Sequence, residues 1–371
     1  MEIKVLISRY VFKLVVSFLL VLTSFVAVKA TTLRVHYDVG FGNSITIRGN
    51  KAPFSWSTGV NATWTSSNIW VYSWPNSVGN VEVKPMINDL TWSIGANYKI
   101  TAGSTVDIYP LFKNTKGTFS KITNFYSPQF GNNRTLLIYL PPSYKENYAK
   151  RYPVLYMHDG QNIFDATTSF GGVEWKVDET INSLVTNGSM DEVIVVGIYN
   201  TGANRIFEYT PCCDAEYGGG GADSYSSFLI NTVKPFVDTN FRTLPSKENT
   251  AIMGSSLGGL VSFYIAYNRP DVFSKAGCMS SSFWWDNRAL VRTVDISTNR
   301  PAVKFYIDAG TNNDGLPNTT SMRDALLVDG YIQGNNLYYY VANGGSHSES
   351  SWSRRINIPL TYMFPFGSTV Y

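Results

Sequence analysis

The sequence predicts a protein of two domains, an all-β sandwich followed by an α/β domain with a mostly parallel sheet. Over residues 31–112, short runs of alternating polar and apolar residues, such as Thr32–Tyr37 and Ile69–Tyr72, are separated by Gly, Pro, Asn and Ser turns. That pattern is typical of a small β-sandwich. Over residues 121–371, apolar strands alternate with helical stretches, which indicates a sheet covered by helices on both faces. Residues 113–120 are polar and are expected to link the two domains.

Residues 1–30 are expected to be a signal peptide. Basic residues precede an apolar run from Leu14 to Val28, and Ala30 offers a small residue at the expected cleavage position. An uncleaved membrane anchor is the alternative, but Lys29 ends the apolar run early. The mature protein is therefore expected to be secreted, extracellular and free of the membrane. Secretion agrees with potential N-glycosylation sites at Asn61, Asn133, Asn187 and Asn318.

Composition narrows the classes of partner. The net charge of +3 includes the basic residues of the signal segment, so the mature chain is nearly neutral and a nucleic-acid partner is not expected. Charged residues and aromatic residues each make up 15% of the chain, which suits a secreted protein that faces neutral polymers. The three histidines and three cysteines have no metal-site spacing, and neither a metal nor a cofactor is expected. At most one disulfide is expected, from Cys278 to Cys212 or Cys213.

Tryptophans are concentrated in the first domain. An exposed indole stacks on the apolar face of a sugar ring, while Lys and Asn side chains hydrogen-bond its hydroxyl groups. Trp70 lies inside an alternating run and is expected to be a core residue. Five of the nine tryptophans fall in this domain: Trp56, Trp64, Trp70, Trp74 and Trp92.

Short motifs in this domain are similar to those of the starch-binding modules that accompany amylases and glucoamylases. The matching segments are Gly40–Gly49, Phe54–Trp56, Val81–Lys84 and Thr91–Asn97. Ser93 stands where those modules usually carry an acidic residue, so the identity of the glucan stays open. The resemblance implies a polysaccharide partner, such as an α-glucan, and a sugar site made of Trp56, Lys84, Trp92 and Asn97.

Periodicity places the main elements of the second domain. The expected strands are Leu136–Leu140, Pro153–Met157, Val193–Gly197, Thr250–Gly254, Val303–Ile307 and Leu337–Val341. The expected helices are Val177–Val185, Tyr225–Val237, Leu257–Tyr267 and Ser321–Val328.

The segment Gly254-Ser-Ser-Leu-Gly258 has the spacing G-x-S-x-G between an apolar strand and an apolar helix. In that arrangement the glycines let strand and helix approach closely, so the central serine, Ser256, is strained and exposed. The amide of Leu257 is then aimed at the site where an oxyanion would develop. An ordinary strand-helix turn is the alternative reading. The turn after the expected strand Pro153–Met157 is placed to supply a second oxyanion amide from Gly160 or Gln161.

A serine nucleophile needs a histidine base and an acid that orients it. Of the three histidines, His36 lies in the sandwich and His158 in the oxyanion turn, whereas His347 follows the last strand in a glycine-rich loop. His347 is therefore the predicted base. Two acids precede it, and we favour Asp314 because a loop carboxylate beyond the strand end can reach an imidazole, while Asp308 remains open.

These segments together resemble the esterase family that includes esterase D, the feruloyl and acetylxylan esterases and the mycolyl transferases. The resemblance runs from about Phe119 to Pro365 and implies an α/β-hydrolase fold and a serine carboxylic-ester hydrolase. Its substrate would be an ester attached to or near a polysaccharide, either a small ester or an acylated sugar. The segments that carry it are Leu155–Phe164, Arg205–Pro211, the turn at Ser256, Asp308–Asp314 and Gly344–Trp352.

Two other functions remain open at this stage: an acyltransferase that acts on a sugar hydroxyl, and a catalytically inert, glucan-binding extracellular protein. Glu349 and Trp352 are expected to brace the His347 loop. The run Phe283-Trp-Trp285 either walls the substrate pocket or belongs to the core.

Overall fold

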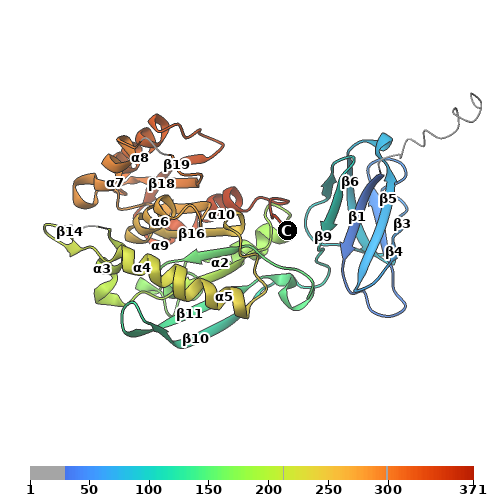
Figure 1. Cartoon of the computed structure of the whole chain (residues 1–371), viewed down its shortest axis with the longest axis horizontal. Coiled ribbons are helices and arrows are strands. Elements are labelled where there is room, and N and C mark those ends of the chain that lie inside the picture. The colour runs from blue at the N-terminus through green and yellow to red at the C-terminus, as the bar shows by residue number, and fades with distance from the viewer. Residues whose placement is uncertain (1–29, 212, 298–299) are drawn as a thin grey trace, which may run out of the picture.

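The computed structural model describes residues 30–211, 213–297 and 300–371. Figure 1 shows a small all-β domain beside a larger α/β domain, with the C-terminus between them. The expected signal peptide, apart from Ala30, lies outside the described residues. Within the described ranges, no helix has both the length and the apolar character needed to cross a membrane.

The first domain is built from two sheets that enclose one core. One sheet has the strand order β4-β5-β1-β9, and the other has the order β3-β2-β6-β7, with β8 paired to β6. Residues from both sheets, such as Val35 and Ile47, are fully buried against each other. The strands are β1 (Ala30–His36), β2 (Ile45–Gly49), β3 (Val60–Asn61), β4 (Thr63–Trp64), β5 (Ile69–Pro75), β6 (Val81–Ile87), β7 (Thr91–Trp92), β8 (Tyr98–Ile100) and β9 (Thr105–Ile108).

The second domain has an eight-stranded sheet of order β10-β11-β13-β12-β16-β17-β18-β19. The first two pairings are antiparallel and the rest are parallel. A small hairpin of β14 (Cys213–Asp214) and β15 (Gly218–Gly219) stands apart from it. The sheet strands are β10 (Thr118–Ser127), β11 (Asn132–Leu140), β12 (Val154–Met157), β13 (Ile194–Ile198), β16 (Thr250–Ser255), β17 (Lys275–Met279), β18 (Lys304–Asn312) and β19 (Leu337–Ser346).

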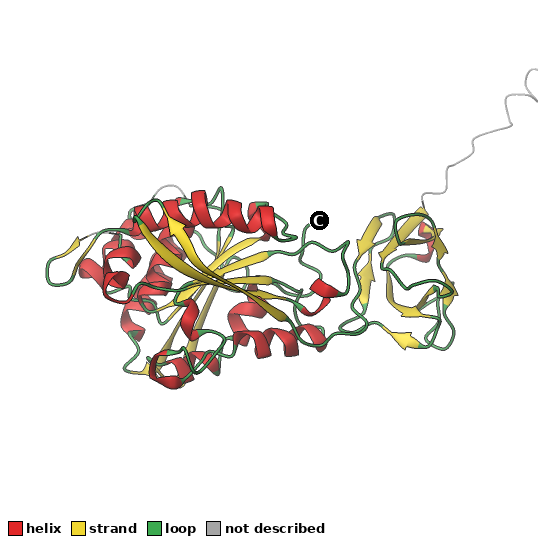
Figure 2. Ribbon diagram, turned by 90° about the horizontal axis from the view of Figure 1, so that it is seen from below, coloured by secondary structure: helices red, strands yellow, loops and turns green. Residues whose placement is uncertain are grey.

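Helices cover both faces of this sheet, as Figure 2 shows. On one face Phe228, Leu260 and Met322 pack against alternate strand residues, and on the other Ile181 and Leu360 do so. A π-helical turn joins α4 to α5. The helices are α2 (Val177–Thr186), α3 (Arg205–Tyr209), α4 (Ala222–Phe228), α5 (Lys234–Asn240), α6 (Leu257–Asn268), α7 (Trp285–Asp295), α8 (Leu316–Val328), α9 (Glu349–Ser353) and α10 (Asn357–Met363).

The expected linker is shorter than residues 113–120, because β10 begins at Thr118. Thr118 to Ile122 pair in register with Leu140 to Leu136 of β11, so these polar residues belong to an edge strand of the sheet. Of the two outcomes that the sequence allowed, one disulfide or none, the described cysteines form none, since Cys278 is a buried free thiol and Cys213 is free and exposed. Cys212 lies outside the described residues.

The two domains meet around Glu146 of the second domain, whose carboxylate accepts hydrogen bonds from residues of the first domain. The Tyr37 hydroxyl donates to it at 2.9 Å and the Phe112 amide at 2.6 Å. The C-terminal residue Tyr371 stacks on Tyr109 at 4.6 Å. These contacts fix the small domain against the side of the large one.

Candidate active site

Ser256 connects β16 to α6 in a conformation that L-residues rarely adopt. Its φ is 58° and its ψ is −124°, so the backbone there is strained. The close approach of strand and helix imposes this turn, because a Cβ on Gly254 would lie 2.7 Å from the carbonyl carbon of Gly258. The local geometry is therefore the one that the G-x-S-x-G spacing predicts.

His347 and Asp314 come together from the loops after the last two strands. The Nδ1 atom of His347 lies 2.7 Å from Oδ1 of Asp314. The other oxygen of Asp314 accepts hydrogen bonds from the Ser280 hydroxyl and the Gly310 amide, both at 2.6 Å. Burial alone would raise the pKa of Asp314, but these hydrogen bonds outweigh it and lower the pKa. The carboxylate is therefore held ionised beside the imidazole.

Asp308, the other candidate acid, is fully buried and bonded to different groups. The Arg355 guanidinium donates to both of its oxygens, at 2.9 and 3.0 Å. The Tyr306 hydroxyl and the Ser280 amide also donate to it, at 2.7 and 2.9 Å. The structure thus places Asp314, and not Asp308, against His347.

Arg355, for which no role was expected from the sequence, joins the two acids. Besides Asp308, its Nη2 atom donates to the Ser280 hydroxyl at 2.7 Å and lies 3.4 Å from Oδ2 of Asp314. Its only signal in the sequence is a basic residue shortly after His347, and such residues are usually exposed. Here the side chain is only 4% exposed, and it forms a buried ionic network with Asp308 and Asp314.

Trp352 and Glu349 follow His347 on α9, but they play different parts. The Trp352 ring meets the His347 ring edge-on at 5.1 Å, and its Nε1 donates to the Ser280 hydroxyl at 2.9 Å. Trp352 therefore braces the histidine loop, as expected. Glu349 instead lines the cavity in front of the serine, and burial raises the pKa of its carboxyl group.

Ser256 and His347 line one cavity of about 390 Å³. The Ser256 hydroxyl oxygen lies 3.4 Å from that of Ser282. Both polar and aromatic groups face this space, among them Asp159, Gln161, Phe170, Arg205 and Trp352. The cavity therefore joins the strained serine, the histidine and the turn predicted to hold the oxyanion.

The oxyanion turn packs directly on the neighbouring strand. A Cβ on Gly160 would lie 2.4 Å from the carbonyl carbon of Gly197 in β13, so only glycine fits there. The Asn200 amide holds the Gln161 side chain at 3.2 Å. In the part of the chain that the structure describes, neither the Gln161 nor the Leu257 amide donates a hydrogen bond, so both are available for an oxyanion.

An ion pair between Asp159 and Arg205 holds the same turn in place. Asp159 has a left-handed φ of 55°, and Arg205 donates to both of its carboxylate oxygens at 2.7 Å. Burial would raise the pKa of Asp159, but Arg205 lowers it. His158 beside it is fully buried, bonds Tyr225 at 2.9 Å, and has its pKa lowered to about 3 by burial. It is therefore a neutral structural residue, as its place in the turn predicts.

The aromatic run Phe283-Trp-Trp285 follows β17, and the structure shows which of its residues belong to the core. Phe283 and Trp285 are buried in the core, whereas Trp284 is 42% exposed. The Trp284 ring contacts Tyr217 of the β14–β15 hairpin at 6.0 Å. Only Trp284 of the three is thus free to meet a ligand.

In the sandwich, Trp56 and Trp92 form an open pair. Their rings lie 6.4 Å apart, and they are 40% and 39% exposed. The Arg48 guanidinium lies 5.1 Å from the Trp92 ring centroid. Trp70 is in the core as expected, and Trp74 is buried with it.

The other two predicted sugar-site residues are already engaged within the chain. The Lys84 ammonium donates to the Gly95 carbonyl at 2.6 Å, and the Asn97 amide donates to Glu82 at 2.7 Å. Asn97 and Glu82 line a cavity of about 620 Å³ at the domain junction. Arg48, which the sequence motifs did not indicate, lies over Trp92 and is itself bonded within the chain, to Asp89 at 2.8 Å and to the Trp56 carbonyl at 3.1 Å.

In the α/β-hydrolases, the loops at the carboxyl ends of a mostly parallel sheet surround a serine that lies on a sharp strand-to-helix turn. The second domain has this architecture. Residues 127–359 match the family described as "Putative esterase". The chain therefore belongs to this family of carboxylic ester hydrolases.

Relatives agree with this assignment. The uncharacterized protein YbbA of Bacillus subtilis is 30% identical over 249 residues, which cover 62% of this chain and 93% of that protein. An endo-1,4-beta-xylanase/feruloyl esterase of Xylanibacter ruminicola is 30% identical over 241 residues, covering 64% of this chain and 30% of its own length. A ferulic acid esterase from Anaeromyces mucronatus, solved with ferulic acid, has a TM-score of 0.51 at 23% identity. It covers 68% of this chain and 92% of that chain, and shows the shared fold.

Proposed function

We propose that the protein is a secreted serine esterase in which Ser256 attacks an ester on or near a polysaccharide. One observation carries the proposal: the strained Ser256 shares a cavity with His347, whose Nδ1 lies 2.7 Å from the buried Asp314. A strained serine, a histidine and a buried acid in the order Ser, Asp, His are the parts that acyl transfer requires.

In the proposed reaction His347 acts first as a base. Its Nδ1–H is committed to Asp314, so Nε2 is the atom left to take the hydroxyl proton of Ser256 as Oγ attacks the carbonyl carbon. The lowered pKa of Asp314 keeps a negative charge beside the imidazolium that forms. His347 then gives the proton to the leaving alcohol, and the acyl group stays on Ser256.

Backbone amides would stabilise the negative charge that develops on the carbonyl oxygen, by donating hydrogen bonds to it. Leu257 and Gln161 supply free N–H groups, and Gly160 lets the second turn lie close enough to β13 to hold its position. Removing one donor of this kind typically costs about 100- to 1,000-fold in turnover. Water activated by His347 then attacks the acyl-enzyme and releases the acid.

The sandwich would hold the polymer that carries the ester. The open pair of Trp56 and Trp92 offers apolar faces for sugar rings, and Arg48 beside it has N–H groups beyond those that it donates to Asp89 and the Trp56 carbonyl. Exposure of the sequon residues Asn61, Asn133 and Asn187 suits a glycosylated, secreted protein. The relative from Xylanibacter ruminicola is named as both an endo-1,4-beta-xylanase and a feruloyl esterase, which favours an ester on a plant polysaccharide.

The test is hydrolysis of a panel of acetyl, butyryl and feruloyl esters by the purified protein, with a fluorophosphonate probe as the label for an active serine. We expect turnover of at least one ester and covalent labelling at Ser256, both absent from Ser256→Ala. A folded protein that neither labels nor hydrolyses any of the esters would contradict the proposal.

A further inference from the structure

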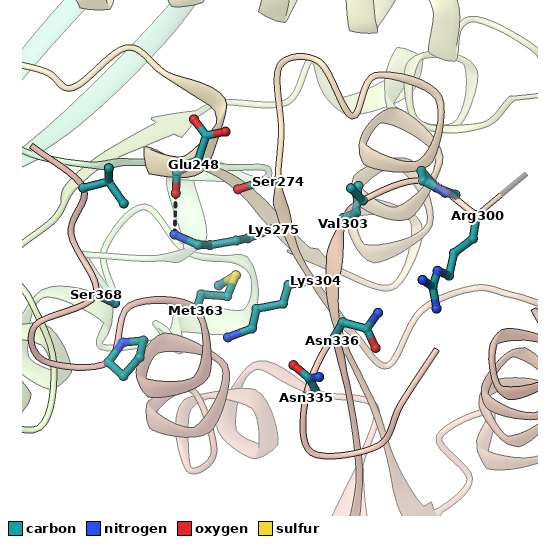
Figure 3. A pocket seen from close by; sticks show the side chains of 14 residues that line it. Glu248, Ser274, Lys275, Arg300, Val303, Lys304, Asn335, Asn336, Met363 and Ser368 are labelled. Carbon is teal, nitrogen blue, oxygen red and sulfur yellow. Dashed lines mark hydrogen bonds between the residues drawn. The ribbon is translucent and has the colours of Figure 1, made fainter. Parts of the chain in front are cut away.

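A second cavity, of about 550 Å³, opens where β17 and β18 begin. The catalytic loops follow the carboxyl ends of these strands, so this cavity lies at the opposite edge of the sheet. Lys275 and Lys304 are the first residues of the two strands and sit opposite each other in the parallel register. Figure 3 shows both side chains running side by side into the cavity.

Both ammonium groups contact neutral groups in the part of the chain that the structure describes. The Lys275 Nζ donates to the backbone carbonyl of Glu248 at 2.7 Å and lies 4.9 Å from the Phe364 ring centroid. The Lys304 Nζ lies 4.7 Å from the ring centroid of Tyr362. Among the residues that the structure describes, no carboxylate oxygen comes within 4.0 Å of either ammonium group.

The nearby carboxylates are directed elsewhere. In Figure 3 the carboxylate of Glu248 points away from the two lysines, and only its backbone oxygen meets Lys275. Asp191, which also acts on Lys275 through space, accepts hydrogen bonds from the amides of Gly367, Ser368 and Thr369 at 2.8 to 2.9 Å. These two carboxylates therefore offset the charge of Lys275 only in part, through space, and form no ion pair with it.

Burial makes this charge costly. Loss of water around Lys275, and then the charge of Lys304, lower the pKa of Lys275 to about 8. Burial likewise lowers the pKa of Lys304. An anion between the two groups would replace the lost water and offset their repulsion. Asn335, Asn336 and Arg300 lie along the remaining wall and add further donors.

We propose that this cavity binds a multiply charged oxyanion, a phosphate or sulfate group, whose oxygens accept hydrogen bonds from Lys275 and Lys304. Lysine is a common phosphate ligand because it acts as a compact point charge. The group would be either free inorganic anion or an ester of it on a sugar. This site is separate from Ser256 and does not depend on the proposed esterase reaction.

The first experiment is calorimetric titration of the full-length protein with sodium phosphate, glucose 6-phosphate and glucose, against sodium chloride of the same ionic strength. We expect phosphate to bind, and Lys275→Met and Lys304→Met each to weaken binding at least about tenfold, the loss of one charge-assisted hydrogen bond. Methionine keeps the apolar stem, and Lys121→Met, an exposed lysine of β10, is the matched control. Tighter binding of glucose 6-phosphate than of phosphate, with none of glucose, would identify the ester as the ligand; the reverse order would identify the free anion.

The second experiment uses the unmodified protein, so it decides the matter even where a variant does not fold. Acetic anhydride labelling followed by mass spectrometry is expected to modify Lys275 readily near pH 8, and phosphate is expected to slow labelling of Lys275 and Lys304 but not of Lys121. Equal labelling of all three with and without phosphate, together with no phosphate-specific heat of binding, would overturn the proposal.

Discussion

Replacing Asp314 or Asp308 by asparagine is expected to affect two different quantities, kcat in the first case and Tm in the second. In Asp314→Asn the amide replaces the carboxylate that accepts the Nδ1–H of His347 at 2.7 Å, so the imidazole loses both its orienting acceptor and the charge that stabilises its protonated form. A loss of up to roughly 10,000-fold in kcat is expected at pH 7. The amide oxygen, placed where Oδ2 lies now, can still accept both hydrogen bonds, from the Ser280 hydroxyl and the Gly310 amide, so the loop should remain in place while the NH2 group faces His347.

Asp308→Asn acts on the fold instead. Arg355 would keep its charge in a site where its side chain is 4% exposed and would lose the closer of its two acidic partners, with Asp314 remaining at 3.4 Å. Breaking a buried ion pair by removing one partner costs about 3–5 kcal/mol. For a domain of this size each kcal/mol lowers Tm by roughly 2–4 °C, so a fall of about 6–20 °C is expected, with a much smaller loss of kcat in the protein that remains folded.

The assay measures kcat on the best chromogenic ester beside thermal melts, for the parent protein and both variants. Asp314→Asn should be nearly inactive and almost as stable as the parent, and Asp308→Asn should be active but should melt early. If Asp308→Asn were instead inactive while melting like the parent, Asp308 would be the acid and the contact between Asp314 and His347 would not be the catalytic one.

Three further results are expected. Ser256→Ala should lower ester turnover by roughly four to six orders of magnitude, whereas Ser255→Ala, at a buried neighbouring residue, should keep most of the turnover. If Ser255→Ala were instead the inactive variant, Ser256 would not be the nucleophile. Trp56→Ala or Trp92→Ala in the full-length protein should weaken binding to a soluble α-glucan by about 1–3 kcal/mol without lowering Tm, and normal binding with a much lower Tm would make them core residues. Without phosphate, Lys275→Met should raise stability relative to the parent below pH 8, because the folded parent must hold a proton on a group whose pKa is lowered to about 8. The unfolded parent binds more protons between this pKa and about 10.4, so its stability rises with pH there and the advantage of the variant should shrink; a constant difference across this range would show that the group is not titrating.

The parts of the fold that the sequence predicts are those with unbroken apolar runs. β12, β13 and β16 are buried along their whole length, and buried parallel strands give a strong signal. β10 was missed because it is an edge strand whose residues are half-buried or exposed almost throughout. β17 was missed because Lys275-Ala-Gly-Cys-Met279 lacks the β-branched residues that mark strands.

The site residues likewise divide into those that local sequence patterns identify and those that only the fold identifies. Ser256 and His347 are predictable because glycine spacing and loop position carry their signal in the local sequence. Lys84 and Asn97 also match local motifs, yet what decides their availability is a hydrogen bond to Gly95 or Glu82, and no motif encodes that. Arg355 carries no local signal at all, since its burial depends on two acids that precede it by more than forty residues.

β17, which was not among the expected strands, runs between the candidate active site and the cavity that contains Lys275. Past its carboxyl end, Ser280 donates its hydroxyl hydrogen bond to Asp314 and its amide hydrogen bond to Asp308, and the Ser282 amide donates to the Ser256 carbonyl at 3.0 Å. At its other end stands Lys275, facing the second cavity. The small residues Ala276 and Gly277 between these ends are also what weakens the strand signal; a Cβ on Gly277 would lie 2.8 Å from the Met253 side chain in β16. Close packing next to the elbow strand therefore selects the residues that make β17 hard to predict, and the same packing holds Ser280 and Ser282 in place beneath the catalytic groups.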